Sequence, residues 1–248
     1  MSSLADSGLE FPRNLDLSDG EVHVWSARLD PAIEAIERLR RLLDPQEATR
    51  ASRFRFEKDR TAFTVARGIL RTLLAGYLGA DAAALQFDYG PQGKPSLSNE
   101  SANGLHFNVT HSALLALFAF VRTREIGIDV ERVRAQTDLE DIAKRFFSRD
   151  EVFALRRLPR RLRDRAFFRC WTRKEAYIKA RGGGLSIPLD EFSVSFSPGE
   201  PAALKSSSLG AAEIDRWSLR DLPVGPAYAA ALVVEGRGWS LRRRSWPR

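Results

Sequence analysis

The stretch Gly127-Ile128-Asp129-Val130-Glu131 decides how this chain folds. Side chains alternate between the two faces of a strand, so residues two apart share a face. This alternation predicts that Ile128 and Val130 face a core, and that Asp129 and Glu131 lie together on the other face. Two carboxylates on one face repel each other unless a proton or a cation lies between them, and oxygen ligands suit magnesium. The alternative is a solvated strand face, which is common for exposed charges.

A second stretch, farther along the chain, reads as a helix. Phe167, Trp171, Glu175 and Lys179 recur every four residues and therefore share one helical face. Glu175 and Lys179 have the favourable order for an ion pair within the helix, which is one interpretation of them. The other interpretation is that Glu175 supplies a third metal oxygen while Lys179 meets a phosphate. The three glycines at 182–184 suit a left-handed helix end.

Composition narrows the class of protein. The chain has 248 residues, enough for one large domain or two small ones. One cysteine excludes an internal disulfide, and three histidines leave too few soft ligands for a zinc site. No secretory signal pattern is visible at the N-terminus. The longest apolar run, 113–121, has nine residues, well short of the roughly 20 that span a bilayer. We therefore expect a soluble, cytoplasmic protein without a membrane segment.

The charge balance favours an anionic partner. Lysine and arginine number 39 against 32 acidic residues, a net charge of +7. Nucleic acid, a phosphate-rich cofactor and an acidic protein all satisfy this preference, so the charge does not choose among them. The chain has no Gly-x-x-x-x-Gly-Lys-Ser/Thr motif, which excludes a P-loop nucleotide hydrolase.

Hydrophobic periodicity and turn residues predict the elements along the chain. Residues 1–20 are expected to form a loose leader, 197–212 a loop and 237–248 a solvated tail. The predicted helices are 31–43, a segment from Asp44 through Arg53, 59–78, 139–147 and the one around 167–179. The predicted strands are 21–27, 105–110, 113–121, 127–131, 213–220 and 228–235, with the opening of a strand pair at 186–196.

Three motifs in order carry a family resemblance. They are Gly127-Ile128-Asp129-Val130-Glu131, then Phe146-Phe147-Ser148-Arg149-Asp150-Glu151, then the helix from Trp171 to Lys179 followed by Gly182-Gly183-Gly184-Leu185. This series resembles the Sfp-type 4'-phosphopantetheinyl transferases. The resemblance implies an α+β fold, a pseudo-dimer of two similar α+β subdomains with coenzyme A in the cleft between them. The subdomains are expected at 1–123 and at 124–248, the second with the metal site, in a monomeric protein.

The resemblance also implies an activity. It implies transfer of 4'-phosphopantetheine from coenzyme A to a serine of an apo acyl or peptidyl carrier protein, with release of adenosine 3',5'-bisphosphate. Carriers of fatty acid, polyketide and nonribosomal peptide assembly all qualify. Asp129, Glu131 and Glu175 are expected to hold Mg2+, while Lys174 and Lys179 stabilise charge on the phosphoryl oxygens.

Five further residues match places where the family contacts coenzyme A. They are Arg50 and Arg53 near the 3'-phosphate, Lys94 in a Gly-Lys-Pro turn, and the neighbours Thr110 and His111. The chain departs from the family at Ala62, where an arginine is common, and Arg67 is a candidate replacement.

The general base is left open between two glutamates. Glu175 is the first choice, acting directly or through a metal-bound water, and Glu151 is the second. Glu151 also completes a capping box with Ser148, which is a purely local role. Two other functions remain as alternatives: a Mg-dependent hydrolase of nucleotide diphosphates, and a basic nucleic-acid-binding module. The second alternative does not account for the carboxylate pattern.

Overall fold

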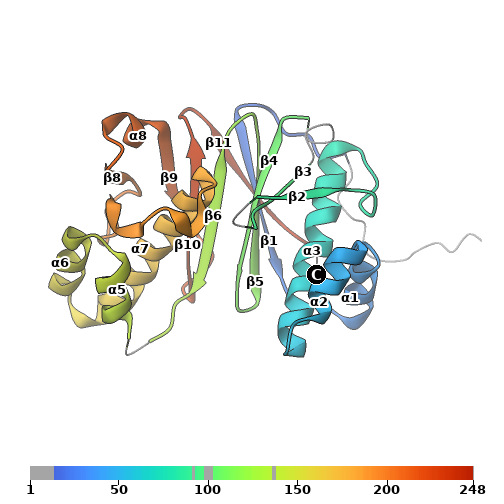
Figure 1. Cartoon of the computed structure of the whole chain (residues 1–248), viewed down its shortest axis with the longest axis horizontal. Coiled ribbons are helices and arrows are strands. Elements are labelled where there is room, and N and C mark those ends of the chain that lie inside the picture. The colour runs from blue at the N-terminus through green and yellow to red at the C-terminus, as the bar shows by residue number, and fades with distance from the viewer. Residues whose placement is uncertain (1–13, 91–92, 98–102, 136–137, 248) are drawn as a thin grey trace, which may run out of the picture. The chain divides into compact units, whose positions relative to one another are not determined.

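The computed structural model describes residues 14–90, 93–97, 103–135 and 138–247. The first 13 residues of the expected leader lie outside this range, as do residues 91 and 92, which directly precede the Gly-Lys-Pro turn. The chain divides into two compact units. In the described chain, one comprises 14–16, 27–86 and 245–247, and the other comprises 17–26 and most of 87–244. Helices and strands are mixed in the chain, and the α+β fold class is confirmed (Figure 1).

The first unit is helical. Its helices are α1 (Ile33–Arg40), α2 (Pro45–Ser52) and α3 (Glu57–Leu78), shown in blue to cyan in Figure 1. Asp44 begins α2 with a reciprocal capping box, in which its side chain accepts from the Glu47 backbone N–H. Both carboxylates also bind Arg71 of α3, at 2.7 Å from Asp44 and 2.6 Å from Glu47. A buried, charge-assisted network therefore joins α2 to α3.

The second unit contains most of the strands. One four-stranded sheet has the order β11-β1-β5-β4, and a three-stranded sheet has the order β6-β10-β9. The bounds of the first sheet are β1 (Glu21–Arg28), β4 (Leu105–Ser112), β5 (Leu115–Arg122) and β11 (Ser240–Ser245). Those of the second are β6 (Ile126–Arg132), β9 (Trp217–Asp221) and β10 (Tyr228–Glu235). Two short pairs complete the set: β2 (Phe87–Tyr89) with β3 (Pro95–Leu97), and β7 (Phe192–Val194) with β8 (Leu204–Ser207).

Helices of the second unit cover the three-stranded sheet. They are α5 (Leu139–Phe146), α6 (Arg149–Arg157), α7 (Arg160–Arg181) and α8 (Ala211–Arg216), with short 3-10 turns at Gly184–Ser186 and Leu189–Glu191. The helix α7 runs along β6 and β10 (Figure 1), and a shared core of buried side chains joins the helices to this sheet. Gly127 of β6 allows the contact, because a Cβ there would overlap the Ala176 carbonyl oxygen and the Ala180 nitrogen.

Most elements lie within a few residues of their predicted positions, and three predictions about the C-terminal part are wrong. The segment 213–220 begins as α8 and becomes β9 only at Trp217. The expected loop 197–212 contains β8. The expected solvated tail contains β11, which pairs with β1 and covers what would otherwise be an open sheet edge. Trp239, directly before β11, is buried.

The division at residues 123 and 124 stays a prediction. The strands β4 and β5, which that division assigns to the first half, belong to the compact unit that also contains β6 and α7. Among the described helices, none combines the length and the apolar character needed to cross a membrane.

Candidate active site

The site is built where β4 lies beside β6. Three polar side chains of β4 accept hydrogen bonds from alternate backbone N–H groups of β6. The pairs are Asn108 with Ile128 at 2.8 Å, Thr110 with Val130 at 3.3 Å, and Ser112 with Arg132 at 3.0 Å. Both members of each pair advance by two residues, so the strands run in the same direction and side chains replace the usual backbone ladder. This ladder sets the position of β6, and with it the two carboxylates.

Asp129 is the most deeply buried acid of the site, with 4% of its surface exposed. Its Oδ1 accepts from the Thr110 hydroxyl at 3.0 Å and from Lys179 Nζ at 2.6 Å. Its Oδ2 is buried and has no hydrogen-bond partner in the described part of the protein. A buried carboxylate oxygen without a donor is costly, so this atom is available to a ligand that the chain itself does not supply.

Glu131 lies two residues farther along the same face, as predicted. Its Oε2 accepts from the Ser112 hydroxyl at 2.7 Å. Burial raises the pKa of this carboxyl, and the negative charge of Asp129 adds to the effect. Asp129 and Glu131 therefore face β4 together and interact electrostatically.

Glu175 approaches from α7. Burial raises its pKa to about 6, with a further contribution from the charge of Asp129 and a smaller one from Glu131, while Lys179 opposes the shift. Glu175 therefore lies close enough to Asp129 and Glu131 for their charges to act on it. Among the described residues, however, no three His, Cys, Asp or Glu side chains are arranged closely enough to hold a metal ion in this structure.

Lys179 pairs with an acid on another element. Its Nζ contacts Asp129 Oδ1 at 2.6 Å, the Ile128 carbonyl at 3.4 Å and the Thr110 hydroxyl at 3.5 Å. In the described ion pairs Lys179 is joined to Asp129 and not to Glu175, so the helical pair allowed by the spacing is not formed. Lys179 is partly exposed and lies beside the carboxylates.

Glu151 and Lys174 form a separate buried pair. Their charged atoms lie 2.7 Å apart, with side-chain exposures of 3% and 0%. Glu151 also accepts from the backbone of Ser148 at 2.8 Å and of Val194 at 2.7 Å. Lys174 donates to the carbonyls of Leu189 and Phe192. The capping box is confirmed.

These contacts use the hydrogen-bonding groups of both side chains inside the protein. The geometry therefore favours a structural role for Glu151 and Lys174, and their predicted roles as base and as phosphate contact find no support in it.

Lys94 lies at a cavity of about 380 Å³ in the second unit, with His106, Glu125 and Gly182 among the lining residues. Its Nζ donates to the Lys179 carbonyl at 2.8 Å and lies 3.7 Å from Glu125. Burial lowers the pKa of Lys94. His106 Nδ1 lies 3.5 Å from Glu125, and a hydrogen bond from His106 lowers the pKa of Glu125. Lys94 is thereby tied to the backbone of α7.

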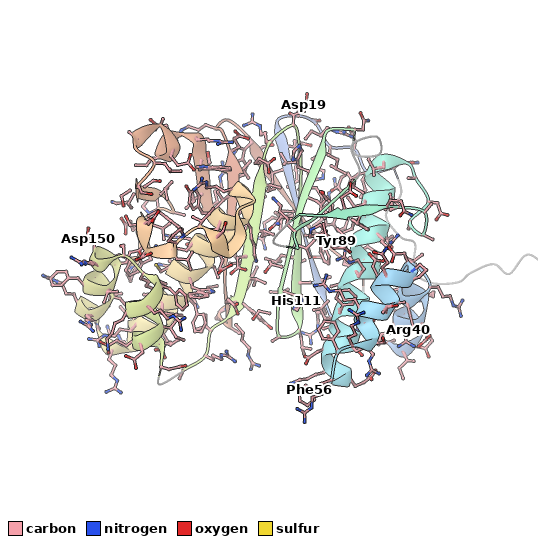
Figure 2. The ribbon with its side chains drawn as sticks, viewed as in Figure 1. Asp19, Arg40, Phe56, Tyr89, His111 and Asp150 are labelled. Atoms are coloured by element: carbon pink, nitrogen blue, oxygen red, sulfur yellow. The ribbon has the colours of Figure 1, made fainter. Side chains whose placement is uncertain are left out.

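The remaining predicted contacts fall in different places. His111 is exposed at the end of β4, next to the turn into β5, where Figure 2 labels it. Arg50 and Arg53 are exposed in the first unit, and the Arg50 guanidinium lies 5.4 Å from the centre of the Phe63 ring. Arg67, the candidate replacement at Ala62, is 8% exposed and lies 3.4 Å from Glu47, so it takes part in the buried network of α2 and α3.

Sequence reasoning missed Asn108, Ser112 and Gly127 as parts of the site. Asn108 and Thr110 share one face of β4 and are buried. The sequence alone does not indicate this burial, because it depends on β6 lying against that face. One signal in the sequence could have identified Asn108 and Ser112. Polar side chains occur at every second position of β4, the same spacing as the two carboxylates of β6.

Comparisons with known proteins agree on one family. Residues 125–233 match the model of the 4'-phosphopantetheinyl transferase superfamily, and residues 27–122 match that of the 4'-phosphopantetheinyl transferase N-terminal region. The 4'-phosphopantetheinyl transferase HetI of Nostoc is 43% identical over 95% of this chain and 97% of its own length. The transferase Sfp of Bacillus subtilis is 32% identical over 65% of this chain and 70% of its own. A solved holo-(acyl-carrier-protein) synthase from Bacillus anthracis, in complex with CoA, covers 46% of this chain and 96% of that one at 24% identity and a TM-score of 0.36.

Proposed function

Because the chain belongs to the 4'-phosphopantetheinyl transferase family and is an enzyme of that kind, we propose that it modifies carrier proteins. The proposed reaction transfers 4'-phosphopantetheine from coenzyme A to a serine of an apo acyl or peptidyl carrier protein and releases adenosine 3',5'-bisphosphate. We propose that it acts as a cytoplasmic monomer and depends on Mg2+. The observation that supports this most is the buried Asp129 carboxylate, which lies 2.6 Å from Lys179 and near enough to Glu175 for its charge to raise the Glu175 pKa.

The chemistry of this group suits a hard divalent cation. The donors are carboxylate oxygens, one of them a buried oxygen of Asp129 that accepts no hydrogen bond from any described residue. Burial and the negative charge of Asp129 raise the pKa of Glu131 and the pKa of Glu175. A bound cation would lower both pKa values again. We infer that Asp129, Glu131 and Glu175 hold Mg2+. When bound, the ion would neutralise charge on the diphosphate of coenzyme A.

Two residues of the chain, Lys179 and Glu175, are proposed to act in the transfer step itself. Lys179, which lies at the carboxylates, would stabilise charge on the phosphoryl oxygens. Glu175, whose carboxyl a bound cation would keep ionised, is the preferred general base. It would take the proton of the carrier serine as the serine oxygen bonds to the pantetheine phosphorus. The bond from that phosphorus to the bridging oxygen breaks, and the electron pair leaves on adenosine 3',5'-bisphosphate.

The other predicted contacts would hold the nucleotide. We propose that Lys94, Thr110 and His111 position coenzyme A, and that Arg50 and Arg53 contribute basic charge from the first unit. Lys94 lies at a cavity, and His111 and both arginines are exposed, as this role requires. The Thr110 hydroxyl donates to Asp129, so its contribution would include holding that carboxylate.

One assay tests the proposal. The purified protein is incubated with coenzyme A, Mg2+ and an apo carrier protein, and the carrier is weighed by mass spectrometry. We expect a gain of about 340 Da, the mass of the phosphopantetheine group. An unmodified carrier together with cleaved coenzyme A would instead identify a hydrolase.

Variants locate the activity. We expect Asp129→Ala and Glu175→Ala each to abolish transfer with little loss of folded structure. Asp141→Ala is the matched control, since Asp141 is exposed and pairs only at the surface with Lys144. Near-normal turnover in either site variant would contradict the assignment.

A further inference from the structure

The Ser112 hydroxyl makes two hydrogen bonds with different partners on β6. It accepts from the Arg132 backbone N–H at 3.0 Å and donates to Glu131 Oε2 at 2.7 Å. A hydroxyl has one proton, so accepting the N–H leaves that proton for the carboxylate. One side chain therefore sets the distance between the two strands and the direction of the Glu131 carboxyl.

The same arrangement occurs two residues earlier. Thr110 accepts from the Val130 N–H at 3.3 Å and donates to Asp129 Oδ1 at 3.0 Å. In both cases the hydroxyl donates to the carboxylate of the residue 19 positions later in the sequence. It also accepts from the backbone N–H of the residue 20 positions later.

The third position of the ladder shows what the hydroxyls add. Asn108 accepts from the Ile128 N–H at 2.8 Å, also 20 residues later, and the residue before Ile128 is Gly127. An amide is enough to hold β6 at this position, where the residue 19 places later is a glycine and not a carboxylate. The two positions that face a carboxylate both have a hydroxyl, which can donate as well as accept.

From this repeated geometry we infer that Ser112 is a positioning residue for Glu131. Its hydroxyl orients the carboxylate toward the cation and keeps it from rotating away, as hydrogen bonds to metal ligands do elsewhere. Thr110 does the same for Asp129. The inference rests on the proposed function, because it assumes that Glu131 is a ligand of the cation.

The test measures cation binding without turnover. Mn2+ is titrated into the full-length protein with saturating coenzyme A and no carrier, and free Mn2+ is followed by electron paramagnetic resonance. We expect Ser112→Ala to weaken Mn2+ binding by about 10-fold or more. Ser112→Thr, which retains the hydroxyl, should bind nearly as well as the unaltered chain. Ser26→Ala on β1 is the control, since in the described part of the chain its hydroxyl makes a single hydrogen bond, at 3.5 Å to the Arg244 carbonyl.

Kinetics add a second readout. The Mg2+ concentration that gives half-maximal transfer should rise in Ser112→Ala, while the rate at saturating Mg2+ should change much less. If Ser112 had a purely structural role, Ser112→Ala would lower the thermal midpoint and the amount of active protein. The Mg2+ concentration that gives half-maximal transfer would then stay the same. Thermal melts of each variant separate the two.

The outcomes distinguish this inference from the proposed function. Unchanged Mn2+ affinity in a folded Ser112→Ala variant would overturn the inference, and transfer by the unaltered chain would still support the function. If Ser112→Ala does not fold, Ser112→Cys replaces it, because a thiol is a weak donor. Absence of both Mn2+ binding and carrier modification in the unaltered chain would overturn the function and the inference together.

Discussion

At the scale of single residues, Glu175 is a buried carboxylate close to other negative charges, and its ionised form is destabilised there. Glu175 is held among other carboxylates with its pKa raised to about 6 from an ordinary value of 4.5. Such a group binds its proton more tightly in the folded state than in the unfolded state. Stability therefore falls as pH rises from about 4.5 to about 6, and the loss persists above that range.

This predicts the effect of removing the charge. Glu175→Gln should raise the free energy of unfolding at pH 7.5 by up to about 2 kcal/mol while abolishing transfer. The gain should largely disappear at pH 4, where the carboxyl is mostly protonated in both states. Urea melts without metal or coenzyme A, at several pH values, measure it. An equal gain at pH 4 and pH 7.5 would show that the cause is not the carboxylate charge.

A second residue-scale prediction concerns Glu151 and Lys174. Glu151→Ala leaves the Lys174 ammonium buried without its partner and should cost about 3 to 5 kcal/mol of stability. Replacing both, with Glu151→Leu and Lys174→Met, should recover much of that loss and retain measurable transfer. A stable but inactive double variant would instead favour Glu151 as the base. Denaturant melts and the carrier mass assay give the two quantities.

At the scale of elements, the approach of α7 to β6 brings Glu175 and Lys179 to Asp129. Gly127 is the residue that permits this approach, since an added Cβ would meet backbone atoms of Ala176 and Ala180. Backbone cannot move aside as a side chain can, so the helix would have to shift.

Gly127→Ala should therefore destabilise the protein by about 3 kcal/mol or more and reduce transfer. Gly20→Ala is the matched control, because a Cβ at Gly20 meets nothing within 4 Å. Thermal melts and mass assays on both variants test this. A Gly127→Ala variant as stable as the control would mean that α7 does not pack on β6 as described.

At the scale of the whole molecule, the C-terminal segment completes a sheet. β11 pairs with β1, the Ser240 N–H bonds to the Gly20 carbonyl at 2.9 Å, and the buried Trp239 lies under the Arg220 guanidinium at 3.9 Å from its ring centre. The arginines at 242–244 are exposed on this edge strand, where charge discourages pairing with other chains.

Removal of residues 240–248 should lower the thermal midpoint and promote aggregation, because it uncovers the edge of β1. Replacing the three arginines at 242–244 by serine keeps the strand and should change stability by less than about 1 kcal/mol. Differential scanning calorimetry and light scattering compare the two. A truncated chain with an unchanged midpoint would restore the solvated-tail interpretation.

The sequence by itself determined the fold class, most of the helices and strands up to α7 (α6 and β3 were not predicted), and the carboxylates that share a face. These follow from local periodicity and from ordered motifs, which depend on neighbours in the chain. Only the tertiary structure decided that Lys179 pairs with Asp129, that Glu151 and Lys174 are buried together, and that the last strand joins the first. Each of these depends on residues far apart in the chain, and burial and partner choice are settled only when those segments pack.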